Sequence, residues 1–375
     1  MRVLHVDSGR EYRGGQNQVR LLARELAREP EVQQLLVTKG GSELARRVDA
    51  EGVPVRRVPW RFGLDPAAQR DLGRAVLEFR PHVLHAHDSH ALGIALAALA
   101  GAELWQPWMW LWPPHLLPGY RRGLQDYDRP LVVATRRVVF PVRRSRVWRR
   151  ADHIVAISQA VKAALLADGL PAGAVTLVRS GIDPEEVRRA ASVLAPLEIR
   201  SRMGLAWNAP LAVNVAALEP PKDQVTLVRG AARARELRPD LHWIIAGEGR
   251  ERRVLEAEIR ALGVGDRVHL AGHVGHPEAL LREAHVCVMS SRHEGLGTVV
   301  LEALALGKPV VAAAGGGLPE VVPGEWLVPV GDAEALARKV VQALDHPVPS
   351  SPTLPPQFTA SAMAAGVLAV YRSLL

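Results

Sequence analysis

The sequence predicts an α/β protein with two doubly wound, Rossmann-like parallel-sheet domains that face each other across a cleft. The chain has 375 residues, which is enough for about two domains of ordinary size. Short apolar runs alternate with helical stretches, first in the N-terminal half and again in the C-terminal half. A polar, arginine-bearing segment separates the halves. We therefore expect a cleft where the carboxyl ends of the two sets of strands meet.

The N-terminal half contains apolar runs that are typical of buried parallel strands. They cover residues 3–6, 34–38, 55–58, 83–85, 131–134, 153–156 and 175–178. The turn Ser180-Gly181-Ile182-Asp183 follows the last run and leads into a polar segment that continues to Met203. We place the hinge there and expect the first domain to comprise residues 1–180.

The C-terminal half repeats this alternation. Its expected strands are 211–215, 242–246, 268–271, 286–289 and 310–313, and the second domain is predicted to span residues 181–350. Residues 346–356 are rich in proline and serine, so they cannot be helical throughout. They are expected to carry a final helix, within residues 357–375, back onto the first domain.

The composition, 48% hydrophobic and 23% charged, is typical of a globular protein. The single cysteine, Cys287, excludes an intramolecular disulfide bond. No signal peptide precedes the first predicted strand, which indicates a cytoplasmic protein. The net charge is +8, and the segment from Arg121 to Arg150 holds ten arginines against two acidic residues. This distribution favours anionic partners such as nucleotides or anionic lipid headgroups.

The segment 293–322 combines two glutamates with two glycine-rich turns. A buried strand is expected before it, and Gly295 and Gly297 allow a tight turn into a helix that begins near Thr298. The first amides of that helix have no partner within it, so a pyrophosphate can bind them. Glu294 and Glu302 would lie about 10 Å apart along this turn and helix. One phosphate cannot satisfy both carboxylates, whereas the hexose and the ribose that flank a pyrophosphate can.

The order of motifs along nearly the whole chain resembles the retaining GT-B glycosyltransferases of the large fourth sequence family. The resemblance rests on GGQNQV at 14–19, PHVLHAHD at 81–88, RRADHIVAISQAVKAALL at 149–166, SGID at 180–183, WIIAGEGRERRVLEAEIRALGVGDRVHLAGHV at 243–274, the segment 293–322 and LVPVGDAEALARKV at 327–340. It implies a GT-B fold and a retaining transfer of sugar from a nucleoside-diphosphate sugar to a hydroxyl acceptor. It also implies no metal, and no cofactor beyond the donor itself.

The same resemblance implies the roles of individual residues. Glu294 would hold the hydroxyl groups of the sugar, Glu302 the ribose and Lys222 the phosphates. A cation at Lys222 can stabilise the charge that develops on the departing nucleoside diphosphate. The other donor-binding positions lie in glycine-rich turns and at strand ends: Gly14, Gly15, Gly247, Glu248, His273, Leu296, Gly297, Thr298, Gly316 and Gly317.

The sequence departs from the family pattern next to the predicted lysine. The family has an arginine five positions before this lysine and a glycine directly after it, where this chain has Ala217 and Asp223. Compensation by Arg292, Arg136 or Arg137 is left open. The missing cation supports an alternative function, that of a GT-B protein that binds nucleotide but transfers sugar weakly or not at all.

A second departure lies at the end of a first-domain strand. Many relatives have a histidine there, near the reacting sugar, where this chain has Thr135-Arg136-Arg137. An arginine cannot act as a base. The role of that histidine would therefore fall to Arg136 as an electrostatic donor in the catalytic site, to His115, or to no residue at all.

Two further patterns suggest metal ligands. His85, His87 and His90 stand beside Asp88, but the first two would point to alternate faces of a strand end and no cysteine accompanies them. We expect His87 or Asp88 to border the cleft instead, with His87 as a catalytic candidate. The second pattern is the D-x-D at 126–128, which precedes its strand rather than following it and is interpreted as a coincidence. No metal site is predicted.

A tryptophan-rich segment at 104–123 is a feature of this chain's own, because relatives have little sequence between the flanking helix and strand. Trp108, Trp110, His115, Arg121 and Arg122 are its candidates for contact with an acceptor or a membrane. A packed loop, an oligomer contact or sugar stacking stay open as alternatives. We expect an acceptor that is lipid-linked or part of a cell-envelope glycan, and a cytoplasmic protein peripheral to the inner face of the membrane. Nucleic-acid binding is disfavoured, because aromatic and basic residues do not interleave on strands.

Overall fold

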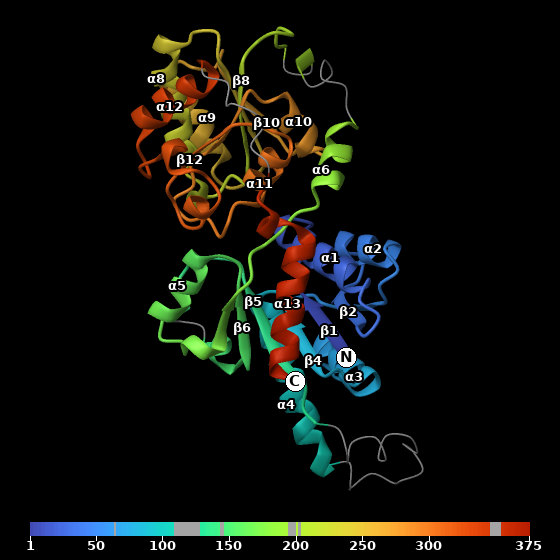
Figure 1. Cartoon of the computed structure of the whole chain (residues 1–375). Helices are drawn as coiled ribbons and strands as arrows, with labels where there is room; N and C mark the ends of the chain where they lie inside the picture. The colour runs from blue at the N-terminus through green and yellow to red at the C-terminus, as the bar shows by residue number, and fades with distance from the viewer. Residues whose placement is uncertain (64, 109–127, 143–145, 194–199, 202–203, 346–353) are drawn as a thin grey trace.

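The computed structural model describes residues 1–63, 65–108, 128–142, 146–193, 200–201, 204–345 and 354–375, which form two α/β units (Figure 1). Each unit is built around one parallel sheet, and the strands of both sheets are buried by helices. Burial on both faces explains why these strands are continuous apolar runs rather than alternating ones. The predicted fold class, two Rossmann-like units of the GT-B type, is confirmed.

The first sheet has seven strands in the order β3-β2-β1-β4-β5-β6-β7. Its strands are β1 (Arg2–Asp7), β2 (Gln33–Lys39), β3 (Val55–Val58), β4 (Val83–Ala86), β5 (Leu131–Arg136), β6 (His153–Ala156) and β7 (Val175–Leu177). Its helices are α1 (Gly14–Leu26), α2 (Glu43–Ala50), α3 (Pro66–Phe79), α4 (Ser89–Trp108) and α5 (Gln159–Ala167). The order reverses between β1 and β4, which is the switch point where α/β proteins place their sites.

The second sheet has six strands in the order β10-β9-β8-β11-β12-β13. They are β8 (Leu211–Val215), β9 (His242–Ala246), β10 (Val268–Gly272), β11 (Val286–Met289), β12 (Val310–Ala313) and β13 (Leu327–Val328). Its helices are α6 (Pro184–Ala191), α8 (Gln224–Leu237), α9 (Arg252–Leu262), α10 (Pro277–Glu283), α11 (Thr298–Ala305) and α12 (Ala333–Asp345). The sequence did not predict β13, because two residues carry no recognisable period.

The last helix, α13 (Ala360–Leu374), lies on the first sheet, as the red ribbon in Figure 1 shows. Met363, Val367 and Tyr371 pack in one cluster with strand residues such as Val3 and Val83. The two segments that connect the units are bonded to each other, because the Ile182 amide donates to the Phe358 carbonyl at 2.9 Å. The chain thus crosses between the two units near Ile182 and again just before α13.

The loops of the two units meet at the carboxyl edges of their sheets. A Cβ at Gly295 would lie 2.1 Å from the Arg137 carbonyl oxygen, and the rings of Phe140 and His293 are 5.6 Å apart. Glu320 accepts a hydrogen bond from the Ala160 amide at 3.0 Å. These contacts place the predicted donor loops directly against the first unit. Separately, none of the described helices is long and apolar enough to span a membrane.

Candidate functional site

Two glycine-rich loops pack together at the carboxyl edge of the second sheet. Gly297 has a φ of 89° and directly precedes α11, and Gly316 in the next loop has a φ of 59°. A Cβ at Gly316 would lie 2.1 Å from the Glu294 carbonyl oxygen, to which the Gly317 amide donates at 2.9 Å. The loops therefore form one backbone surface that only glycine permits. It leads into Leu296 to Thr298, where the free amides of α11 can bind an anion.

Lys222 and Glu294 form an ion pair beside these loops. Lys222 ends the short 3₁₀ turn Pro220–Lys222 after β8, and its Nζ donates to Oε2 of Glu294. The Ser291 hydroxyl donates to the same oxygen at 3.2 Å, and the Ser290 hydroxyl donates to the Lys222 carbonyl at 2.9 Å. The side chains of Lys222 and Glu294 remain 25% and 12% exposed. The pair is held in place yet reachable by a polar ligand.

Sequence reasoning selected Lys222 and Glu294 but did not predict that they pair, and it missed the two serines. The signal was present: Ser290 and Ser291 directly follow the apolar run of β11, where a parallel strand delivers its side chains to the site.

The two departures from the family pattern next to Lys222 have structural partners. Asp223 has a φ of 49°, a left-handed conformation that glycine adopts most easily, which explains why a glycine is usual there. Its carboxylate pairs with Nε of Arg292 at 2.8 Å. The carbonyl of Ala217 accepts from Gln224 at 3.0 Å, and its methyl side chain supplies no charge. Arg292 is therefore committed to Asp223.

Gly247, Glu248 and His273 lie in the loops that follow β9 and β10 at the same edge. Gly247 has a φ of 144°, and a Cβ there would lie 1.9 Å from the Ala216 carbonyl oxygen, so the backbones after β8 and β9 touch. The Gly247 amide donates to the carbonyl of Gly272 at 2.8 Å, directly before His273. Glu248 is half-exposed and pairs with Arg252 at 3.1 Å. The structure thus joins three neighbouring loops around the predicted donor positions.

Glu302 projects from α11 into a cavity of about 40 Å³ between the two units. Asn17 and Arg20 of α1, Glu186 of α6 and Glu278 of α10 line this cavity. Burial, and secondarily the negative charge of Glu278, raise the pKa of the Glu302 carboxyl to about 8. Lys222 and Glu294 are not among the residues that line this cavity.

The first unit presents the turn at Gly14 and Gly15 to these loops. Both residues belong to the first turn of α1, and Gln16 closes the N-terminus by accepting from the Arg13 amide at 3.3 Å. A Cβ at Gly14 would lie 3.3 Å from Oγ1 of Thr298, in the opposite unit. The predicted glycine turn therefore faces the N-terminus of α11 directly.

Two buried or half-buried carboxylates lie behind this turn. Burial, then the charge of Asp88, raises the pKa of Asp7 to about 6, although the Gly9 amide donates to it at 2.9 Å. Asp88 caps α4: it accepts from the amides of His90 and Ala91, each at 2.9 Å, and from the amide and hydroxyl of Ser8. Asp88 thus has a structural role as the cap of α4. Asp7 caps no helix among the described residues.

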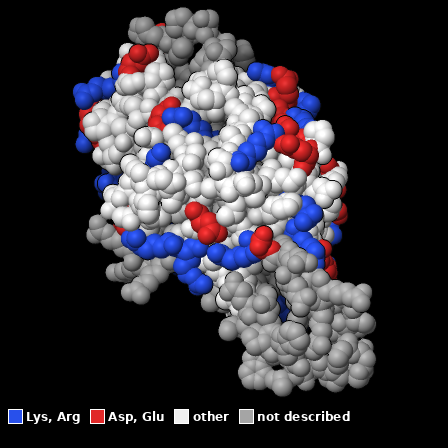
Figure 2. Space-filling view, turned by 60° about the horizontal axis from the view of Figure 1, so that its bottom comes forward, with Lys and Arg blue, Asp and Glu red and all other residues white. Residues whose placement is uncertain are grey.

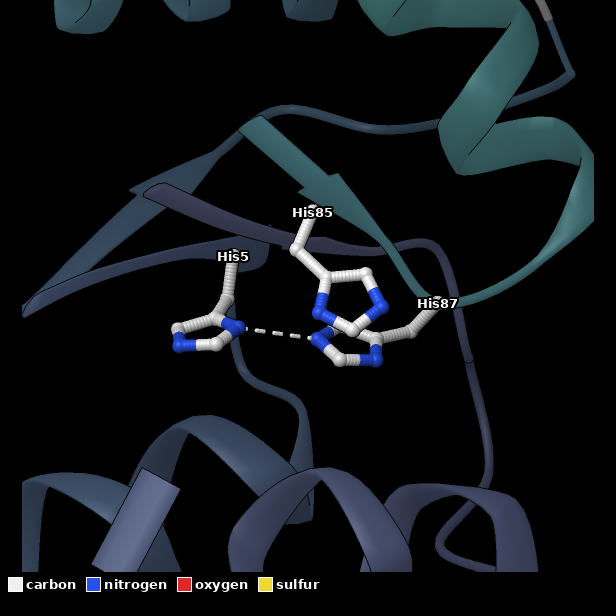
Figure 3. A group of neighbouring side chains, drawn as sticks. All are labelled: His5, His85 and His87. Carbon is white, nitrogen blue, oxygen red and sulfur yellow. Dashed lines mark hydrogen bonds between the residues drawn. The ribbon is translucent and has the colours of Figure 1, made fainter. Parts of the chain in front are cut away.

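Three buried histidines lie together behind the same turn (Figure 3). His5 of β1 joins His85 and His87, and the rings of the latter two are 4.2 Å apart. The expectation that His85 and His87 point to opposite faces was wrong, because residues two positions apart along a strand share a face, and His87 directly follows the last residue of β4. His90, the third histidine of the sequence pattern, is exposed. Burial lowers the pKa of His5 to about 4 and those of His85 and His87 well below their usual range.

The hydrogen bonds of this cluster have a defined direction. An arginine only donates, so Nδ1 of His87 accepts from Arg137 at 3.4 Å and its Nε2 carries the proton. That nitrogen donates to Nδ1 of His5 at 3.0 Å, and Nε2 of His5 donates to Oε1 of Gln34 at 3.1 Å. His87 is 2% exposed, so it is not placed to touch a substrate as predicted. It supports Arg137 instead.

The ring nitrogens of His5, His85 and His87 lie within 4.8 Å of one another, close enough to be considered as metal ligands. Each ring is already hydrogen-bonded, however: His85 contacts the hydroxyls of Tyr371 at 2.5 Å and Thr135 at 2.6 Å. Bound metal would have to replace these contacts beside the positive charge of Arg137. The geometry therefore favours a hydrogen-bonded cluster, and the expected lack of a metal stays a prediction.

The structure corrects the choice between the two arginines at the end of β5. The guanidinium of Arg136 lies over the ring of Trp148, 4.9 Å from its centroid, and donates to the Phe140 carbonyl at 2.6 Å. It therefore packs against its own unit instead of serving as the predicted electrostatic donor. Arg137 donates to the His87 carbonyl and lies between the glycine turn and the Glu294 loop.

The predicted acceptor segment is mostly outside the described residues. Trp110, His115, Arg121 and Arg122 lie there, as does Asp126 of the D-x-D pattern, and Trp108 is the last residue of α4. Of the described arginines that follow, Arg129 pairs with Asp152 at 3.5 Å and Arg149 donates to the carbonyls of Asp168 and Gly169. Figure 2 shows basic and acidic side chains next to each other over the described part of this face.

Comparisons with known proteins match both units to glycosyltransferases. The family model "Glycosyl transferases group 1" matches residues 198–354, and "Glycosyl transferase 4-like domain" matches residues 13–181. The chain is 30% identical over 363 residues to 2-deoxystreptamine N-acetyl-D-glucosaminyltransferase of Streptomyces fradiae, covering 88% of this chain and 82% of that protein.

Other relatives match over less of their length. The putative glycosyltransferase EpsD of Bacillus subtilis is 31% identical over 173 residues, 44% of each chain, and 2-deoxystreptamine glucosyltransferase of Streptomyces kanamyceticus is 29% identical over 59% of this chain and 57% of its own. Among solved structures, Anabaena HepE in complex with UDP superimposes with a TM-score of 0.75 at 19% identity, covering 100% of both chains. That likeness concerns the fold.

Proposed function

The chain belongs to the glycosyl transferases group 1 family, and from this premise we propose that it is a retaining, metal-independent glycosyltransferase. It moves a sugar from a nucleoside-diphosphate sugar to a hydroxyl acceptor. The observation that carries the proposal is the Lys222–Glu294 ion pair beside the glycine loops at the N-terminus of α11. HepE has been solved in complex with UDP and with UDP-glucose, which supports a nucleotide-sugar donor.

Each part of the site has a task in this mechanism. Amides at the start of α11 bind the diphosphate, and Lys222 stabilises the charge that develops as it departs. Glu294 accepts hydrogen bonds from sugar hydroxyls, and Glu302 from the ribose. The acceptor oxygen forms its bond to the anomeric carbon on the face from which the phosphate oxygen leaves. The acceptor proton passes to that phosphate oxygen, so the products are the glycoside and a nucleoside diphosphate.

Replacement of Glu294 tests the proposal. E294A removes the group that orients the sugar and leaves Lys222 without its partner, so transfer should fall by at least about 100-fold. The measurement is release of nucleoside diphosphate and formation of glycoside across a panel of nucleotide sugars. E325A is the control, because Glu325 is exposed in the short turn Gly324–Trp326. Unchanged turnover in a folded E294A protein would remove the central claim.

The alternative is a nucleotide-binding protein without transfer, and Ala217 is the observation that favours it. The same panel separates the two. A binder that does not catalyse is protected by nucleotide against thermal unfolding, yet it releases no sugar from any donor, even by slow hydrolysis.

We propose further that the acceptor hydroxyl belongs to a lipid-linked or cell-envelope glycan and that the protein acts on the inner face of the membrane. This part rests on the sequence of residues 104–123. In the same transfer assay, an acceptor presented on anionic vesicles should therefore be used better than the same glycan free in solution, and an equal rate would contradict it.

A further inference from the structure

The donor side of the site is short of positive charge for a diphosphate. Lys222 is paired with Glu294, Arg292 is paired with Asp223, and position 217 carries a methyl group. We infer that Arg137, contributed by the first unit, is the second cation of the site and binds the diphosphate of the donor from across the cleft. This inference rests on the proposed function, because it names a residue for the same leaving group.

The position of Arg137 is the first support. A Cβ at Gly15 would lie 3.8 Å from Cδ of Arg137, and a Cβ at Gly295 would lie 2.1 Å from its carbonyl oxygen. Arg137 is therefore enclosed by the glycine turn of the first unit and the Glu294 loop of the second. Thr298 approaches Gly14 beside it, so an anion bound at the N-terminus of α11 lies next to this arginine.

The second support is that the guanidinium of Arg137 is fixed in position but does not use all of its hydrogen-bond donors. The guanidinium donates hydrogen bonds to two atoms of His87, the carbonyl oxygen and Nδ1. The buried Nε of Arg137 has no hydrogen-bond partner among the described residues, and Asp7 and Asp88 act on the guanidinium only through their charge. A buried donor of this kind costs stability unless a ligand completes it. Nε of Arg136 also lacks a partner, but its guanidinium is stacked on Trp148.

The surroundings preserve the charge. Burial lowers the pKa of the Arg137 guanidinium, whereas the nearby Asp7 and Asp88 raise it, and an arginine stays protonated in either case. Asp88 already accepts four hydrogen bonds from Ser8, His90 and Ala91. A cation in a dry site acts more strongly on a neighbouring anion than one in water. The planar fork of arginine also matches the oxygens of a phosphate.

His87 and His5 are positioning residues in this arrangement. Gln34, the last member of the chain of hydrogen bonds, donates through Nε2 to the Ala23 carbonyl at 3.0 Å, which sets its amide so that Oε1 faces His5. Each histidine is thereby restricted to one tautomer. Nδ1 of His87 is left as an acceptor, and only a donor such as the guanidinium can occupy the place beside it.

Nucleotide binding to four proteins tests the inference: the wild type, R137Q, R137K and the control R129Q. Arg129 lies two residues before the first residue of the same strand, β5, at its other end, where it pairs with Asp152. The probes are UDP and GDP, with the matching monophosphates UMP and GMP, measured by calorimetry. We expect R137Q to weaken binding of the diphosphate by about 10-fold or more, and that of the monophosphate by less than about threefold. R129Q should match the wild type.

A second arm restores the missing charge. A217R in the R137Q background returns a cation to the other side of the diphosphate and should recover at least about threefold of the lost affinity. If R137Q does not fold, R137K carries the test: it keeps the charge without the fork and should lose about three- to tenfold for the diphosphate alone.

The outcomes separate the two proposals. If the folded R137 variants bind the diphosphate as tightly as the wild type does, the inference about Arg137 is wrong and the proposed function stands. If they weaken diphosphate and monophosphate equally, Arg137 has only a structural role and the inference is again wrong. If the wild type binds none of these four nucleotides and no other nucleoside diphosphate of the donor panel, the proposed function fails and this inference fails with it.

Discussion

The two units share one architecture but use the carboxyl edges of their sheets differently. In the second unit, polar side chains such as Lys222 and Glu294 remain partly exposed among loops that only glycine can form. In the first unit, His5, His85 and His87 are buried and hydrogen-bonded to one another or to the core. In the functions proposed above, the second unit would bind the ligand through accessible groups, whereas the first would contribute Arg137 from a fixed position.

The largest effect should come from the backbone of the second unit. G247A places a Cβ 1.9 Å from the Ala216 carbonyl and forces alanine to a φ of 144°. Such a conformation costs on the order of 1–3 kcal/mol, and relief of the clash would move the loop that carries Glu248. We expect a lower melting temperature and a loss of nucleotide-induced stabilisation, both measured by thermal unfolding with and without nucleotide.

G275A is the matched control, because Gly275 lies in the loop after β10 and a Cβ there meets nothing within 4 Å. It should melt like the wild type and keep its response to nucleotide. If G247A also melts like the wild type and responds to nucleotide, the close approach of the loops after β8 and β9 is not needed for binding. The proposed difference between the two units would then lose support.

The second unit was also the one in which the sequence indicated most of the residues that the structure brings together at the candidate site. Glu294, Lys222 and the glycines come from short motifs, in which the residues that meet in space lie within one strand-loop-helix segment or follow adjacent strands. The parallel strands were predictable for the same reason, since each is a continuous apolar run. What a motif could not show was the pairing of Lys222 with Glu294, because the two residues are 72 positions apart in the sequence.

A change in the first unit, H5L, should have an effect of intermediate size. H5L removes the acceptor for Nε2 of His87 and leaves buried polar groups unpaired, which should lower the free energy of unfolding by about 1–3 kcal/mol. Arg137 loses part of its support, so transfer should fall too. His5 also makes stability depend on pH. In the folded wild type its pKa is about 4, whereas in the unfolded chain it is near 6.5. The unfolded chain therefore binds more protons between these values, and the free energy of unfolding of the wild type falls as pH drops below 6.5. H5L should show a shallower acid limb in urea unfolding.

A second histidine pair offers the control. Nδ1 of His242 lies 3.0 Å from Nε2 of His269 on β9 and β10, but His242 begins its strand, away from the carboxyl edge that forms the site. H242L should cost less stability, since this pair is partly exposed, and it should leave transfer unchanged. Equal losses in H5L and H242L would show that the cluster in the first unit has no link to the site.

The cluster in the first unit was not predictable from sequence for a physical reason. His5 and His87 are 82 positions apart, and Gln34 lies on a third strand, so only the sheet order β2-β1-β4 brings them together. The choice of Arg136 over Arg137 failed for a related reason. Adjacent residues at a strand end point to opposite sides, and the sequence does not show which side faces Trp148 and which faces the glycine turn.

The smallest effect is expected at Glu302, and its sign is opposite to that of the histidines. The folded protein keeps the proton of this carboxyl up to about pH 8, whereas the unfolded chain releases it near its ordinary pKa of 4.5. The folded state therefore binds more protons between those values, and the free energy of unfolding falls as pH rises. The side chain of Glu302 is only partly buried, so solvent screening reduces this effect, and E302Q should flatten the limb by on the order of 1 kcal/mol, whereas E325Q should leave it unchanged. Parallel profiles for wild type and E302Q would show that solvent reaches the carboxyl freely. Because nucleotide ribose is proposed to bind the charged carboxylate, saturating UDP or GDP should also reduce the slope in the wild type and not in E302Q.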